Sequence, residues 1–184
     1  MVDPVTRSAA RWAAAIALPV ALVAGFLSYR ALTGAAHPAP SATPAPQSTG
    51  PVTMPAPALA DRPATVCRAL LSQLPDALRD RHRRPVTAGP EQNAAYGDPA
   101  ITLACGAGPQ PSLPPDATVY NLSGVCWYAD QGATTTAWTT VDREVPVTVT
   151  VPNSYAGQGQ WVIGFSPVIG TSVPGGATNP AGCR

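Results

Sequence analysis

The clearest pattern in the chain is a strict alternation of apolar and polar residues near residue 150. Val145, Val147, Val149 and Val151 recur at every second position, with threonines between the later ones. A period of two is typical of a β-strand with one buried face and one open face. The sequence therefore predicts a strand over residues 143–152.

Three further segments have the composition of strands and are bounded by turn-forming residues. They are 133–141, 124–128 and 100–105, the last entered through Gly97-Asp98-Pro99. Strands joined by tight connections, such as Asp142-Arg143, pair antiparallel. We therefore expect an antiparallel sheet of about four strands.

Two segments carry a helical pattern instead. Residues 65–79 place apolar side chains at spacings of three and four, and Pro75 is expected to bend or restart this helix. Residues 161–169 predict a short, irregular C-terminal helix, since Gly164 and Pro167 disfavour a helix interior. The expected fold class is α+β, a small antiparallel sheet packed against one or two helices.

The N-terminal region is apolar. Residues 12–29 contain no charged side chain, and a helix of that length covers about 27 Å, close to the thickness of a bilayer core. Arg7 and Arg11 precede this run and Arg30 follows it, so the positive-inside rule favours a cytoplasmic N-terminus. We expect a short cytoplasmic segment (1–11), a single transmembrane helix (12–30) and a cell-membrane location. A signal peptide cleaved near residues 34–36 is the alternative.

Proline and alanine dominate residues 31–63, and the chain contains 23 prolines in all. Such a segment buries too little apolar surface to offset its ordering entropy. It predicts a disordered spacer that leads to an extracytoplasmic domain over residues 64–184. The formal net charge of +1 gives no global field that would attract nucleic acid, so nucleic acid is not an expected partner.

The four cysteines, Cys67, Cys105, Cys126 and Cys183, all follow the apolar segment. An even number of cysteines in an oxidising compartment indicates two disulfides, for which three connectivities exist. We favour Cys67 with Cys105, tying the helix to a strand, and Cys126 with Cys183, tethering the C-terminus to the sheet. A redox-active Cys126–Cys183 pair is an alternative. No cysteine spacing indicates a zinc site, and we expect no metal or cofactor.

A basic cluster is the strongest candidate for binding. Arg79, Arg81, Arg83 and Arg84 lie within six residues, opposed by Asp80. Guanidinium groups bind phosphate and carboxylate, so an anionic wall polymer or another envelope protein is the expected partner. The alternative is a solvated surface that complements the end of the preceding helix.

Catalytic patterns are weak, and we assign no catalytic residue. His82 lies among arginines and is expected to be a surface histidine. The chain also contains no GxSxG motif of the kind that carries a serine nucleophile. Asp98, Asp130 and Asp142 lie at expected turns or in an expected hairpin. Aspartate is favoured there because its side chain bonds the local backbone, which explains these residues better than acid–base catalysis does. The tryptophans Trp127, Trp138 and Trp161 could form a carbohydrate-stacking platform but are more often core residues.

Several pieces together carry a resemblance to a known family. CRALLSQLPDALRD, RHRRPV, AAYGDPAITLACG, GVCWY and WTTVDREVPVTVTVP follow one another in this order. Across residues 66–173 the chain resembles an actinobacterial family of membrane-anchored proteins, known as domain of unknown function thirty-five fifteen. The family commonly has Trp where this chain has Tyr96. It also carries cysteines matching Cys67 and Cys105, which supports the favoured disulfide pairing. The resemblance implies a location and a fold, and no activity.

Together these observations predict a membrane-anchored, extracytoplasmic cell-envelope protein that binds or scaffolds without catalysis. The alternative is an extracytoplasmic enzyme that acts on cell-wall precursors or lipids.

Overall fold

The computed structural model describes residues 19–30, 47–114, 116–177 and 183. The chain divides into two units, 1–45 and 46–184, and each is considered by itself. In the first unit, residues 19–30 form a helix. The predicted cytoplasmic segment (1–11), the cleavage site of the alternative signal peptide (34–36) and the first part of the spacer lie outside the described residues.

The predicted transmembrane helix needs correction. The structure describes a helix over residues 19–30, which is only part of the predicted span of 12–30. Within the described ranges, no helix combines the length and the apolar character needed to cross a membrane. Residues 12–18 of the predicted span are not among the described ones.

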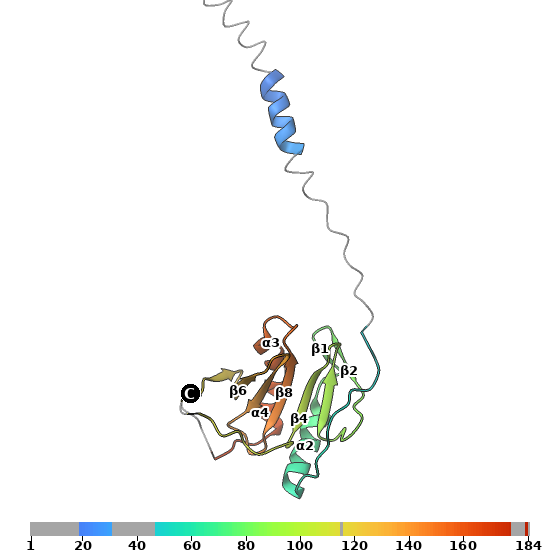
Figure 1. Ribbon diagram of the computed structural model, residues 1–184, viewed down its shortest axis with the longest axis vertical. Helices are drawn as coiled ribbons and strands as arrows, with labels where there is room; N and C mark the ends of the chain where they lie inside the picture. The colour runs from blue at the N-terminus through green and yellow to red at the C-terminus, as the bar shows by residue number, and fades with distance from the viewer. Residues whose placement is uncertain (1–18, 31–46, 115, 178–182, 184) are drawn as a thin grey trace, which may run out of the picture. The chain divides into compact units, whose positions relative to one another are not determined.

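A single antiparallel sheet forms the centre of the second unit (Figure 1). In the described part of the chain it contains eight strands in the order β1-β2-β3-β4-β8-β7-β6-β5. The strands are β1 (Ala77–Leu78), β2 (Arg81–Arg84), β3 (Asn93–Tyr96), β4 (Ile101–Cys105), β5 (Val119–Leu122), β6 (Val125–Gln131), β7 (Thr135–Thr140) and β8 (Val147–Pro152).

The prediction of about four strands is wrong, because it did not include β1, β2, β3 and β5. These strands have two to four residues each, too short for an alternating pattern. In the turn between β1 and β2, Arg79 has a φ of 56°. Gly or Asn usually occupies such a left-handed position, so an arginine there gave no sign of a turn in the sequence. The predicted strands at β4, β6, β7 and β8 are present, although β8 begins after Pro146, which has no N–H for the ladder.

Helices α2 (Asp61–Gln73), α3 (Gln158–Val162) and α4 (Ser166–Ser172) accompany the sheet. α2 ends before Pro75, so the chain does not continue as the longer bent helix that the sequence predicted. α2 and α4 contact each other, α4 contacts β6 and α3 contacts β8 (Figure 1). The helices and the buried side of the sheet share one apolar cluster, which includes Leu70, Leu103, Val149 and Ile169.

A smaller apolar cluster is formed by Cys126, Val141 and Cys183, with Leu113 and Tyr128 packed against it. In β6 the side chains of Cys126 and Trp127 point to opposite faces, since successive residues of a strand alternate. Trp127 belongs to the main core and Cys126 to the small cluster, so the small cluster lies on the other side of the sheet.

Residues 47–60, which the sequence assigned to the spacer, lie against the folded domain. The Val52 N–H donates to the Pro85 carbonyl at 2.8 Å, and the Thr87 N–H donates to the Val52 carbonyl at 3.0 Å. Met54 in the same segment is 7% exposed. A proline-rich segment can dock in this way because its carbonyl groups remain available as acceptors.

Candidate functional site

The four candidate arginines lie on the β1–β2 hairpin and its turn. Arg79 is in the turn, and β2 alternates its side chains across the sheet. Arg83 pairs with Tyr96 and Arg84 with Ala95, so Arg81 and Arg83 lie on the face of Tyr96 while His82 and Arg84 lie on the opposite face. The alternation therefore separates Arg84 from Arg81 and Arg83, which share one face of the sheet.

Arg79 and Arg81 stack on aromatic rings from the segment around α3. The Arg79 guanidinium carbon lies 4.9 Å from the ring centroid of Trp161, and that of Arg81 lies 5.6 Å from the centroid of Tyr155. The two rings contact each other edge to face, with centroids 4.9 Å apart. We call these four residues the arginine–aromatic cluster. Cation–π contacts of this kind hold a guanidinium in one orientation, so fewer of its rotamers are lost when it binds.

Hydrogen bonds and one ion pair fix both halves of the arginine–aromatic cluster. Arg79 Nη2 donates to the Gln160 carbonyl at 3.1 Å, and Arg81 Nη2 lies 3.1 Å from the Asp80 carboxylate. The Tyr155 hydroxyl donates to the Pro99 carbonyl at 2.7 Å. Burial raises the pKa of Tyr155, with the charge of Arg81 acting in the opposite direction, so Tyr155 is a neutral donor at physiological pH.

Arg84 has a structural role. Its side chain is 12% exposed, and it donates to the Gly97 carbonyl at 2.9 Å and to the Gly50 carbonyl at 3.0 and 2.8 Å. It thereby joins the sheet to the N-terminal segment and to the Gly97-Asp98-Pro99 turn. Arg83 differs: its side chain makes no hydrogen bond or ion pair with the residues that the structure describes.

The carboxylates and His82 are dispersed. Asp98 lies 3.8 Å from Arg84 Nη1, Asp142 lies 3.3 Å from Arg143 Nε, and Glu144 lies 2.9 Å from Arg62 Nε. His82 is exposed and has no carboxylate partner among the described side chains. The described residues also include no group of three His, Cys, Asp or Glu side chains arranged to hold a metal ion.

A family model matches residues 16–178 of the chain, across both of its units. The chain belongs to the DUF3515 family. The family is described as a protein of unknown function, and the match does not confirm the actinobacterial source or the membrane anchoring that the resemblance implied. No curated protein and no solved structure matches the chain.

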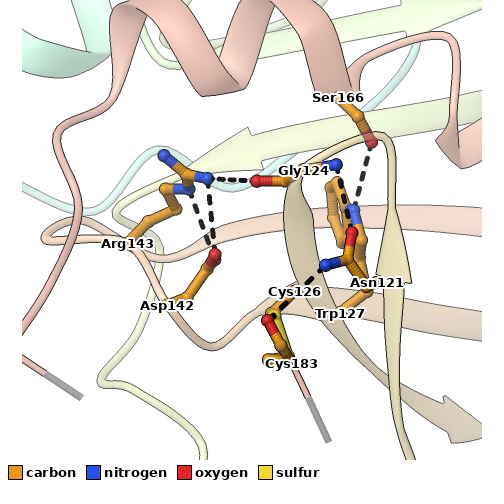
Figure 2. The surroundings of a disulfide bond; sticks show 8 residues. All are labelled: Asn121, Gly124, Cys126, Trp127, Asp142, Arg143, Ser166 and Cys183. Carbon is orange, nitrogen blue, oxygen red and sulfur yellow. Dashed lines mark hydrogen bonds and ion pairs between the residues drawn. A yellow bond between two sulfur atoms is a disulfide. The ribbon is translucent and has the colours of Figure 1, made fainter. Parts of the chain in front are cut away.

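Both disulfides of this DUF3515 protein have the favoured connectivity. Cys67 of α2 is bonded to Cys105 of β4, and Cys126 of β6 is bonded to Cys183. The Asn121 side chain donates to the Cys183 carbonyl at 3.5 Å next to the second bond (Figure 2). The prediction of two disulfides is therefore confirmed.

The three tryptophans are core residues, as the sequence favoured, and the alternative of an open carbohydrate-stacking platform is not formed. Trp127 is fully buried, and its Nε1 donates to the Ser166 hydroxyl at 3.2 Å (Figure 2). Trp138 and Trp161 are each 8% exposed. Trp161 nevertheless contributes to the arginine–aromatic cluster, where Arg79 covers its ring.

Tyr155 is the member of the arginine–aromatic cluster that sequence reasoning missed. It lies in the loop between β8 and α3, far along the chain from the arginines. No local pattern links it to Arg81, because their contact depends on β2 and α3 lying at the same end of the sheet (Figure 1).

Proposed function

We propose that this DUF3515 protein is a non-catalytic binding module of the cell envelope. Its arginine surface, defined as Arg79, Arg81 and Arg83, binds an anionic wall polymer. The observation that carries the proposal is the stacking of Arg79 and Arg81 on Trp161 and Tyr155. Arg83, on the same strand as Arg81, makes no side-chain hydrogen bond or ion pair in the described part of the chain.

The disulfides support a location outside the cytoplasm. Both bonds are formed, and the described residues contain no free cysteine. Structural disulfides persist in oxidising spaces and are rare where cytosolic thiols are kept reduced. An extracytoplasmic domain would meet the anionic polymers and headgroups of the envelope.

The chemistry of the arginine surface suits phosphate or carboxylate groups. A guanidinium presents its N–H donors in a planar fork, which matches these anions better than an ammonium does. Asp80 neutralises part of the charge by pairing with Arg81, whereas Arg79 and Arg83 have no ion-pair partner among the described residues. Arg79 and Arg83 are therefore the residues to test.

The test is binding of the full chain to an isolated phosphate-bearing wall polymer, with neutral dextran as the reference polymer. We expect the double variant Arg79→Gln and Arg83→Gln to weaken binding about tenfold or more, because charge-assisted hydrogen bonds contribute roughly 1.5–3 kcal/mol each. Each single variant, Arg79→Gln and Arg83→Gln, is compared with Arg62→Gln, which removes one charge from α2. A loss in Arg62→Gln equal to that in both single variants would show a response to net charge alone and would contradict the proposal.

A further inference from the structure

A second feature lies apart from the arginine surface. A cavity of about 240 Å³ opens between the N-terminal segment at residues 56–59, the first half of α2 and the turn at residues 89–92. Arg68 of α2 and Glu91 of the turn both line it, together with Gln92. The cavity thus combines a cation, an anion and an amide within a small volume.

The cavity depends on the docking of the N-terminal segment. Gln92 Nε2 donates to the Pro57 carbonyl at 3.2 Å, and Asn93 Nδ2 donates to the Pro55 carbonyl at 2.8 Å. Gly89 has a φ of +58°, and a Cβ atom there would lie 2.7 Å from the Ala56 Cβ. Glycine therefore allows the close approach of the segment that forms one wall of the cavity.

The two charged side chains of the cavity are not paired with each other. No ion pair joins Arg68 and Glu91, and neither side chain has a hydrogen bond or ion pair with any other described residue. Opposite charges that line one cavity without meeting leave space for a ligand that bears both charges.

Gln92 adds a polar group to the lining of the cavity. The residue is 4% exposed, so its position is set by its surroundings. Its Nε2 is occupied by Pro57, while its Oε1 accepts no hydrogen bond from the described residues. A carbonyl oxygen in this position can accept a hydrogen bond from an ammonium group.

We propose that this cavity binds a small zwitterion, with an ammonium group and a carboxylate on one molecule of amino-acid or dipeptide size. The carboxylate binds the Arg68 guanidinium, and the ammonium group binds Glu91 and the Oε1 of Gln92. The cavity volume of about 240 Å³ lies just below the usual range of ligand pockets, roughly 300–1,000 Å³, which suits a ligand with few atoms. The inference does not depend on the proposed polymer binding, since it concerns other residues.

The test is a titration of the isotopically labelled full chain, followed by amide chemical shifts. The probes are L-alanine and L-alanyl-L-alanine, which represent a free amino acid and a short peptide. The blocked compounds N-acetylalanine and alaninamide each lack one of the two charges. We expect saturable shifts at the amides of Gly89, Glu91 and Gln92, with each blocked compound binding about tenfold more weakly. The zwitterion that binds more tightly shows whether the cavity favours a free amino acid or a short peptide.

Single substitutions test the contributions of Arg68 and Glu91 to ligand binding one at a time. Arg68→Gln should abolish the preference for alanine over alaninamide, and Glu91→Gln should abolish the preference for alanine over N-acetylalanine. Both side chains are exposed, so folding is expected to be preserved. The control is Arg62→Gln on the same helix, which should keep both preferences. Absence of saturable shifts at millimolar concentration, or equal binding of the blocked compounds by the unaltered chain, would overturn the proposal.

Discussion

Arg84 and Gly50 lie far apart in the sequence, yet two nitrogens of the Arg84 guanidinium donate to the Gly50 carbonyl at 3.0 and 2.8 Å. The same guanidinium reaches the Gly97 carbonyl at 2.9 Å. One side chain therefore holds the N-terminal segment and the turn before β4 against the sheet. An arginine that satisfies backbone carbonyls in this way is part of the fold rather than a free binding group.

Replacing Arg84 should destabilise the domain. We expect Arg84→Met to cost about 2–3 kcal/mol, since it removes several hydrogen bonds from a charged donor and leaves carbonyls unpaired. Urea unfolding of the full chain measures the loss, and hydrogen exchange at Val52 and Thr87 should become faster. Arg83→Met is the matched control, because Arg83 has no side-chain hydrogen bond in the described part. An equal cost in both variants would refute the structural role of Arg84.

Removing the Cys67–Cys105 disulfide should have a large effect. The bond closes a loop with a sequence separation of 38, and both cysteines are fully buried in the main core. We expect the double replacement of Cys67 and Cys105 by Ala to lower the free energy of unfolding by about 4 kcal/mol. Urea unfolding provides the measurement. A loss below about 1 kcal/mol would show that the packing of α2 against β4 does not need the bond.

The buried contact between Trp127 and Ser166 gives a sharper test of the core (Figure 2). Ser166→Ala leaves the indole N–H of Trp127 buried without an acceptor, and we expect a cost of about 1–3 kcal/mol. Ser172→Ala, on the same helix, is the control, because the Ser172 hydroxyl is buried without a hydrogen-bond partner among the described residues. Thermal or urea unfolding compares them. A smaller cost for Ser166→Ala than for Ser172→Ala would contradict this interpretation.

Tyr96 should make the domain sensitive to alkaline pH. Burial raises the pKa of Tyr96 to about 12, from 10.0 in the unfolded chain, while Arg83 acts to lower it. The folded state keeps this proton after the unfolded state has lost it. The contribution is therefore fully present below pH 10 and declines as the pH rises towards 12, by roughly 2–3 kcal/mol in total.

Unfolding midpoints in urea across this pH range provide the measurement for Tyr96. The Tyr96→Phe variant should show a flatter decline, although it also loses the hydrogen bond from the Tyr96 hydroxyl to the Pro75 carbonyl at 2.8 Å. An unchanged pH dependence in Tyr96→Phe would exclude Tyr96 as the group responsible.

Local patterns in the sequence determined several parts of this protein. The alternation at residues 147–151 identified β8, and the apolar spacing from Val66 to Leu74 identified the buried side of α2. The even number of cysteines indicated two disulfides, which the structure contains. These features could be predicted because a strand, a helix and a disulfide count each leave a signal within a short stretch of chain or in the composition.

Tertiary structure alone decided what the arginines do and which segments join the fold. Nothing near RHRR distinguishes Arg84, which binds Gly50 and Gly97, from Arg83, whose side chain makes no hydrogen bond or ion pair with the described residues. The short strands β1, β3 and β5 exist because neighbouring strands supply their hydrogen bonds. Likewise, residues 47–60 are ordered by contacts with Pro85, Thr87 and Asn93. Such contacts join residues distant in sequence, so their energies depend on a geometry that no local pattern encodes.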